Sequence, residues 1–283
     1  MKKIITLTLV LLFGVSLLNA GGNITIKGSD TLVRLGQRWA EEYMKLNPGV
    51  VVQVSGGGTG TGIAALINGS TDICQASRDM KEKEYKQAEV RGIKPYRVAV
   101  SLDGISIFLN EKNPVKELTF AQLKGIYTGA ITNWKEVGGN DARIIVYGRE
   151  NNSGTYAFFK EHVLDEEDYS DYTQTLPGTA AVVNAVAKDV NGIGYGGIAW
   201  ATGVRYAAIK KTDQDQAVLP SMETVSNGTY PISRELFWFF SGQPQGELKK
   251  LVNWALSEEG QKVAESVDYI PLPRELAEKN KIK

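Results

Sequence analysis

VVVQVSGGGTGTGIAALINGSTDI, residues 50–73, is the stretch that determines the fold of this chain. Its β-branched residues predict a strand, five glycines follow, and the apolar run from Ile63 predicts a short helix. A glycine loop between a strand and a helix lets the backbone approach a ligand closely, and the free amides at the helix start favour an anion. A nucleotide, a dinucleotide and a free oxyanion are all compatible with such a loop.

The same alternation of strand and helix continues on both sides of this stretch. Residues 23–49, NITIKGSDTLVRLGQRWAEEYMKLNPG, predict a strand, a polar turn and a helix whose apolar residues recur at helical spacing. DICQAS, residues 72–77, predicts a third strand. This βαβαβ order indicates a parallel sheet covered by helices, and such sheets bind ligands at the carboxyl ends of their strands.

A second alternation of helices and strands follows the long strand-like run YRVAVSLDGISIFLN, which is interrupted at Asp103-Gly104. Its elements are LTFAQLKGIYTG (helix), RIIVYG (strand), GTYAFFKEHVL (helix), TAAVVNAVAKD (helix) and GIGYGG (strand). PISRELFWFFSG then predicts a strand that crosses back, and GELKKLVNWALSEEGQKVAES predicts one C-terminal helix. We therefore predict two α/β lobes, with residues 21–105 and 226–283 in lobe one and residues 106–225 in lobe two.

The chain begins with MKKIITLTLVLLFGVSLLNA, in which two lysines precede an apolar run and a small residue, Ala20, ends it. This pattern is typical of a secretory signal peptide, and the run is shorter than the roughly 20 apolar residues of a membrane-spanning helix. No cysteine follows the run, so the pattern predicts no lipid anchor. We therefore predict an exported, periplasmic protein whose signal peptide, residues 1–20, is cleaved near Ala20.

The charges of the predicted mature chain nearly balance. Without Lys2 and Lys3, the chain has 30 basic residues against 32 acidic ones, a net charge of −2. Bulk electrostatic attraction therefore cannot recruit an anion or a nucleic acid, and we predict no nucleic-acid partner. Any anion site must be built locally.

Cysteine and histidine are each present once, as Cys74 and His162. A single cysteine excludes an internal disulfide and a thiolate metal cluster, and a single histidine leaves the usual zinc sites and Ser-His-Asp triads incomplete. We predict a buried, inert thiol at Cys74 and a position on a helix surface for His162. We predict no metal and no cofactor.

Three polar segments rich in Gly, Ser and Thr each stand between a predicted strand and a predicted helix. They are KGSDTL (residues 27–32), SGGGTGTG (residues 55–62) and GRENNSGTYAF (residues 148–158). Each helix start carries about half a positive charge and several free amide donors, so three of them aimed at one point would hold a tetrahedral oxyanion. Taken singly, each segment has another explanation, since Ser29 and Thr31 suit helix caps and the glycines suit a tight turn.

Five motifs resemble, in their order and spacing, the periplasmic phosphate-binding proteins of the high-affinity phosphate ABC importer. They are GSDTL, GGGTGTGIAALINGSTDICQASR, LTFAQLKGIYTGAITNWKEVGG, RENNSGT and GIGYGG. The resemblance covers nearly the whole predicted mature chain. It implies a type II periplasmic-binding-protein fold, in which two α/β lobes, each a mixed sheet flanked by helices, close over phosphate in a cleft. It also implies a monomeric receptor that hands inorganic phosphate to a membrane ABC permease.

The resemblance places phosphate contacts in all three polar segments. In the first, Thr31 binds through its hydroxyl and amide and Leu32 through its amide, while Thr59 supplies a hydroxyl from the glycine loop. The third segment supplies the Arg149 guanidinium, whose paired charge-assisted bonds suit an oxyanion. The complete set of candidate phosphate-binding residues is Ser29, Asp30, Thr31, Leu32, Thr59, Arg78, Arg149, Ser153, Gly154 and Thr155.

One position departs from the best-known members of that family, in which the strand after the glycine loop ends in Ala-Ser-Asp and the aspartate accepts the phosphate proton. Here the sequence reads QASRDM, with Arg78 at that position and Asp79 one residue later. The proton acceptor is then Asp30 or Asp79. We favour Asp30, because it lies inside the first polar segment, whereas Asp79 can pair with its neighbour Arg78.

Other functions match parts of the sequence. GGGTGTG, with Asp79 about 20 residues later, partly matches a dinucleotide fingerprint, but its helix is short, its spacing is G-x-G-x-G, and export argues against a nicotinamide cofactor. A P-loop is excluded, because no Gly-Lys-Ser/Thr follows the glycines. A secreted phosphoester hydrolase would use Ser153, but NNSGT lacks the G-x-S-x-G motif. A protein of the same fold could also bind phosphate for adhesion or sequestration. We predict a binding protein and no enzyme.

Overall fold

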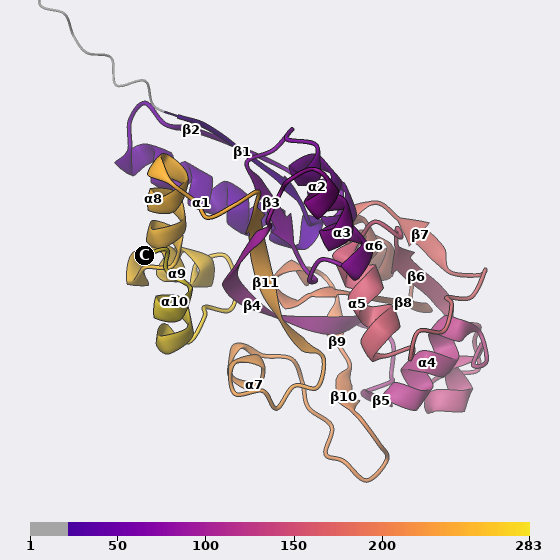
Figure 1. Ribbon diagram of the computed structural model, residues 1–283. Coiled ribbons are helices and arrows are strands. Elements are labelled where there is room, and N and C mark those ends of the chain that lie inside the picture. Colours follow the sequence, from indigo (N-terminus) through magenta and orange to yellow (C-terminus); the bar gives the residue numbers. More distant parts are fainter. Residues whose placement is uncertain (1–21) are drawn as a thin grey trace, which may run out of the picture.

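A mixed sheet runs through the molecule in the computed structural model, which describes residues 22–283 (Figure 1). The predicted signal peptide, residues 1–20, lies outside the described residues. The strands of this sheet are β1 (Asn23–Gly28), β2 (Val51–Ser55), β3 (Ile73–Ala76), β4 (Tyr96–Leu109), β6 (Ile145–Arg149), β7 (Gln174–Leu176), β8 (Gly192–Gly197), β9 (Arg205–Tyr206) and β11 (Ser233–Phe240). Their order is β2-β1-β3-β11-β4-β8-β6-β7, and β9 pairs with β4. A separate parallel pair consists of β5 (Glu117–Thr119) and β10 (Ala208–Lys210).

Helices pack around this sheet and connect its strands. The α-helices are α1 (Val33–Leu46), α2 (Thr59–Ile67), α3 (Glu82–Val90), α4 (Phe120–Thr128), α5 (Gly154–His162), α6 (Gly178–Lys188), α7 (Met222–Ser226), α8 (Gly246–Ala255), α9 (Glu258–Glu265) and α10 (Arg274–Asn280). The 3-10 helices are η1 (Asp30–Leu32), η2 (Trp134–Val137) and η3 (Ile198–Trp200). The predicted α/β class with a mixed sheet is confirmed.

The arrangement predicted from the glycine stretch is present at the start of the chain. β1 pairs in parallel with both β2 and β3, and α1 and α2 are the crossover helices. On α1, Leu35, Trp39 and Tyr43 recur at helical spacing and are buried against the sheet. The sheet becomes mixed where β11 lies antiparallel between β3 and β4.

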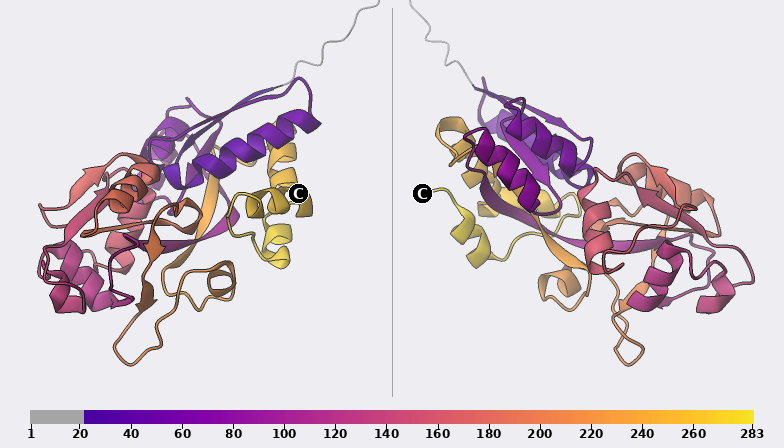
Figure 2. Two further views of the ribbon diagram at one scale, coloured as in Figure 1. Left: turned by 180° about the vertical axis from the view of Figure 1, so that it is seen from behind. Right: turned by 45° about the vertical axis from the view of Figure 1, so that its right-hand side comes forward.

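Two large hydrophobic cores lie toward opposite ends of the molecule (Figure 2). The first core combines side chains of β1, α1, α2, β3, the beginning of β4, β11 and the C-terminal helices, from Ile24 to Ile282. In it, the rings of Trp39 and Trp238 meet edge to face, with centroids 5.2 Å apart. The second core combines the end of β4 with α4, β6, α5 and β8. We call the parts of the molecule around these cores the first half and the second half.

The predicted interruption of the long strand at Asp103-Gly104 is wrong. β4 is continuous over 14 residues, and it pairs with β11 as far as Gly104 and with β8 from Ile105 onward. A carboxylate is tolerated inside this strand because Arg234 of β11 lies opposite Asp103 in register and forms an ion pair with it. One strand therefore contributes to both halves.

The single C-terminal helix predicted from the sequence is also wrong, since α8 ends at Ala255 and α9 begins at Glu258. Between them, Ser257 caps α9, because its Oγ accepts a hydrogen bond from the Gly260 amide at 3.2 Å. The Gly260 carbonyl in turn accepts a hydrogen bond from the Trp39 indole at 2.7 Å. The break lets both helices pack against the first core.

Candidate functional site

The three polar segments of the sequence meet between the two halves. Thr31 of η1 and Thr155 of α5 approach to 3.0 Å between their hydroxyl oxygens. Thr59, the first residue of α2, lies 3.3 Å from the hydroxyl of Ser77, which also accepts a hydrogen bond from the Ser29 hydroxyl at 2.8 Å. All five residues are buried, with at most 2% of their surface exposed. We call Ser29, Thr31, Thr59, Ser77 and Thr155 the hydroxyl cluster.

The start of α5 needs a glycine to reach this cluster. A Cβ on Gly154 would lie only 2.4 Å from Thr59 Oγ1 and 2.5 Å from Ser77 Oγ. Ser153 precedes it as the N-cap of α5, and its Oγ accepts a hydrogen bond from the Tyr156 amide at 3.3 Å. The positive end of the α5 dipole therefore lies against the hydroxyl cluster.

Arg149, at the end of β6, is linked to the cluster through Asp30, the residue between Ser29 and Thr31, and its side chain is 2% exposed. Its Nη2 donates to Asp30 Oδ2 at 2.6 Å, and its Nη1 donates to Thr179 Oγ1, in the first turn of α6, at 2.9 Å. The other Asp30 oxygen, Oδ1, accepts from the Gly57 amide at 2.9 Å. The Nε of Arg149 is buried and has no hydrogen-bond partner among the residues that the structure describes. Only two of the five N–H groups of this guanidinium therefore donate to the described residues, and the others remain for another acceptor.

A second buried ion pair contacts the cluster, and the sequence pattern did not predict it. Arg234 donates to Asp103 Oδ2 through Nη2 at 2.6 Å and Nε at 3.0 Å, and neither side chain is more than 3% exposed. Arg234 also reaches the Ser77 carbonyl at 2.7 Å and the Thr155 hydroxyl at 2.9 Å. Burial lowers the pKa of Arg234, and Asp103 opposes that shift. A charged residue inside an apolar run, as Asp103 in VAVSLDGISIFL and Arg234, beside Glu235, in PISRELFWFF, is the signal that could have identified both residues.

Leu32 and Arg78 are the remaining residues of the predicted set. Leu32 lies next to the cluster, whereas Arg78 forms an ion pair elsewhere. Leu32 is fully buried in η1, beside Thr31. Arg78 does not join the hydroxyl cluster, because Glu84 of α3 holds its guanidinium with hydrogen bonds of 2.8 and 2.9 Å. Arg78 therefore pairs within the first half, with a side chain that is 11% exposed.

Asp79 also has partners outside the cluster. Its carboxylate accepts a hydrogen bond from Arg97 at 2.8 Å, and both side chains are almost half exposed, at 47% and 45%. Its other oxygen accepts hydrogen bonds from the Tyr85 hydroxyl and the Met80 amide. Asp79 is paired with its neighbour Arg78 through the backbone, since Arg78 Nη1 donates to the Asp79 carbonyl at 2.8 Å, while the Asp79 carboxylate takes other partners.

The glycine loop, residues 55–62, binds groups of the protein itself. The Gly57 amide holds the Asp30 carboxylate, as described above. The Gly60 amide donates to the Asn152 carbonyl at 2.9 Å, and Asn152 Nδ2 donates to the Gly57 carbonyl at 3.0 Å. The anion that this loop binds is therefore the Asp30 carboxylate. The loop contributes the Thr59 hydroxyl to the cluster.

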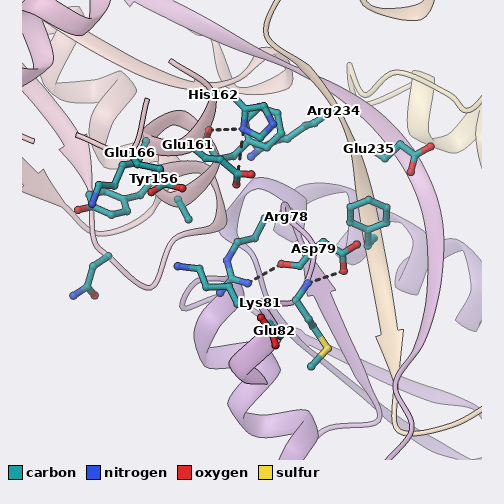
Figure 3. A pocket seen from close by; sticks show the side chains of 16 residues that line it. Arg78, Asp79, Lys81, Glu82, Tyr156, Glu161, His162, Glu166, Arg234 and Glu235 are labelled. Carbon is teal, nitrogen blue, oxygen red and sulfur yellow. Dashed lines mark hydrogen bonds and ion pairs between the residues drawn. The ribbon is translucent and has the colours of Figure 1, made fainter. Parts of the chain in front are cut away.

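A pocket of about 1080 Å³ adjoins the cluster, because Arg234 both lines this pocket and bonds Thr155 (Figure 3). One wall is formed by residues 78–82 at the start of α3, and the other by α5. His162, at the end of α5, lies on the second wall, where its ring stacks on Phe158 with centroids 3.9 Å apart. The predicted helix-surface position of His162 is confirmed.

Cys74 lies on β3 and is fully buried, so the predicted buried thiol is confirmed. Burial raises the pKa of this thiol and keeps it protonated. Within residues 22–283, no group of three or more His, Cys, Asp or Glu side chains is placed to hold a metal ion. In the same part of the chain, every helix is too short or too polar to cross a membrane.

Comparison with known proteins gives one family. The model of the PBP superfamily domain matches residues 18–259. The phosphate-binding protein PstS of Pseudomonas aeruginosa is 36% identical over 276 residues, covering 91% of this chain and 85% of that protein. PstS of Staphylococcus epidermidis is 32% identical over 262 residues, covering 89% and 80%.

Solved structures give the same answer. A substrate-binding protein from Clostridium perfringens with bound phosphate superposes with a TM-score of 0.81 at 31% identity, covering 89% of this chain and 100% of that one. An ABC-type phosphate transport receptor from Vibrio cholerae superposes with a TM-score of 0.71 at 30% identity, covering 88% and 100%. The fold predicted from the sequence is therefore the fold of these solved binding proteins.

Proposed function

This chain belongs to the PBP superfamily and, within it, to the family of the PstS phosphate-binding proteins, and on that premise we propose that it is an extracytoplasmic receptor that binds inorganic phosphate and delivers it to an ABC permease. The observation that carries the proposal is the buried Arg149 guanidinium, which is linked to the five buried hydroxyls through Asp30 and whose Nε has no partner among the described residues. Buried polar groups are normally hydrogen-bonded, so this site is built for a polar ligand.

We propose that phosphate lies between Arg149 and the hydroxyl cluster. Arg149 supplies charge-assisted hydrogen bonds, and the hydroxyls and the amides at the starts of η1 and α5 complete the shell without adding charge. Asp30, held by Arg149 and the Gly57 amide, is placed to accept a phosphate proton. The proposed ligands are Ser29, Asp30, Thr31, Leu32, Thr59, Ser77, Arg149, Ser153, Gly154 and Thr155, with Arg234 behind Thr155.

We further propose that the two halves are lobes that close over the ligand. Lobe one consists of residues 21–105 and 226–283, and lobe two consists of residues 106–225. The two cores support this division, as does the contact between Thr31 and Thr155, which come from different halves. β4 runs from lobe one into lobe two, and the chain returns to lobe one just before β11, so these two crossings form the hinge about which closure occurs.

The remaining proposals concern the form in which the chain works. We propose that residues 1–20 direct export and are removed near Ala20, and that the mature protein acts as a monomer without a nucleic-acid partner. We also propose that it catalyses no reaction. Ser153 caps α5 and is no free nucleophile, and the single histidine, His162, lies at the opposite end of that helix.

Isothermal titration calorimetry is expected to detect one orthophosphate per chain, with sub-millimolar affinity or better. The protein must first be stripped of bound ligand, for example by unfolding and refolding in phosphate-free buffer. The expectation follows because the polar segments converge on one buried cluster. Heat with NAD and none with phosphate would contradict the proposed function, and turnover of a phosphate ester would contradict the absence of catalysis.

Replacement of Asp30 by Asn is expected to lower the ratio of phosphate affinity to sulfate affinity by at least about tenfold. Phosphate near neutral pH carries a proton that a carboxylate can accept, whereas sulfate offers Asp30 only lone pairs and like charge, and a site that pairs a ligand O–H rejects analogues lacking it. Competition titrations measure the ratio. Asp79→Asn is the matched control and should leave it unchanged. If Asp103→Asn changes the ratio and Asp30→Asn does not, the proton acceptor is Asp103.

A further inference from the structure

Asn152 connects the two halves of the molecule outside the hydroxyl cluster. It lies between β6 and α5, in the second half, whereas its partners belong to the glycine loop of the first half. Its Nδ2 donates to the Gly57 carbonyl at 3.0 Å and reaches Thr61 Oγ1 at 3.3 Å. Its backbone carbonyl accepts the Gly60 amide at 2.9 Å. One residue thus makes three hydrogen bonds across the cleft.

The glycine loop is shaped for this contact. Gly57 and Gly58 have φ of +106° and +87°, a region that residues with a side chain rarely adopt. A Cβ on Gly58 would lie 2.8 Å from the Asn152 carbonyl oxygen, and one on Gly60 would lie 3.3 Å from it. The glycines therefore let the backbone of Asn152 approach the loop at hydrogen-bond distance.

We propose that Asn152 is a positioning residue that holds the closed form by binding the glycine loop, and that it thereby sets the rate at which the ligand leaves. This inference rests on the proposed function, in which the halves close over phosphate. The three bonds exist only when the halves are together, so they stabilise the closed form relative to the open one. They do not involve the hydroxyl cluster, so the encounter of phosphate with the open form does not depend on them.

Asn152→Ala is expected to raise the dissociation rate of phosphate about five- to tenfold, since it removes two side-chain hydrogen bonds of ordinary strength. The association rate should stay within about twofold. Both rates follow from rapid mixing with radiolabelled phosphate and a chase with unlabelled phosphate. Asn151→Ala is the matched control, because Asn151 is exposed and its side chain makes no hydrogen bond to the residues that the structure describes. Asn152→Asp should also release phosphate faster, because a carboxylate facing the Gly57 carbonyl cannot donate.

The outcomes separate this inference from the proposed function. Equal dissociation rates in Asn152→Ala and the unmodified protein, or a change confined to the association rate, would overturn the role of Asn152 and leave the phosphate site intact. Absence of phosphate binding by the unmodified protein would overturn the proposed function. Hydrogen exchange at the Gly60 amide of the phosphate-bound proteins then tests the contact itself: faster exchange in Asn152→Ala, whose closed form has lost two of the three bonds, supports it, and equal exchange in both proteins refutes it.

Discussion

Replacement of Arg149 by Ala is expected to weaken phosphate binding by about 100- to 10,000-fold. A hydrogen bond to a charged group contributes about 1.5–3 kcal/mol when water is excluded, and a guanidinium offers two parallel ones to an oxyanion. Arg149 meets that condition, since its side chain is 2% exposed. Calorimetry on the stripped protein measures the loss. Arg149→Lys should lose less than Ala, because it keeps the charge and loses only the planar fork.

Arg97→Ala is the matched control for that experiment. Arg97 also pairs with an aspartate, Asp79, at 2.8 Å, but its side chain is 45% exposed. Exposed ion pairs contribute little, so the phosphate affinity of Arg97→Ala should stay within about twofold of the unmodified protein. If Arg149→Ala binds phosphate as tightly as Arg97→Ala does, the anion lies elsewhere.

Replacement of Asp103 by Ala is expected to lower the free energy of unfolding by about 3–5 kcal/mol, because it leaves a buried guanidinium without its counter-charge. Arg234 is 2% exposed and makes its two carboxylate hydrogen bonds to this one residue. Urea denaturation of the phosphate-free protein measures the loss without the stabilisation that a bound ligand adds. The matched variant Asp79→Ala breaks an exposed pair and should cost about 1 kcal/mol or less.

A double variant, Asp103→Leu with Arg234→Met, checks the cause of that destabilisation. It removes both charges and replaces them with apolar side chains, which are often as stable as a buried ion pair or more so. The double variant should therefore unfold at a higher urea concentration than Asp103→Ala alone. Equal stability of the two variants would mean that packing around Asp103, and not the unpaired charge, explains the loss.

The fold could be predicted wherever the information is local. Apolar spacing on α1 and the glycine stretch predict the parallel start of the sheet, and both are present. An Asp-Gly pair locally favours a turn, and this local preference predicts the interruption of β4. It is wrong because Arg234, 131 residues away in the chain, neutralises Asp103 inside the sheet. No local pattern contains that pairing.

The candidate site, too, could be predicted from the sequence only where its features are local. Thr31, Thr59 and Thr155 could be proposed together because each begins a helix after a strand, and that feature is local. The partners of the charged groups could not be proposed, since they depend on which segments face one another after folding. Glu84 takes Arg78 away from the cluster, and Ser77 enters it through its position at the end of β3.

The first core unites the two ends of the described chain, because it contains both Ile24 and Ile282, whereas the second core is drawn almost entirely from a continuous stretch. This imposes an order on events during synthesis. The second core can assemble as soon as its own strands and helices have been made. The first core stays incomplete until the last helices are present, and until then β1, α1 and α2 expose apolar surface that a chaperone can bind. A chain truncated before α8 should therefore aggregate and should not persist as a partly active protein.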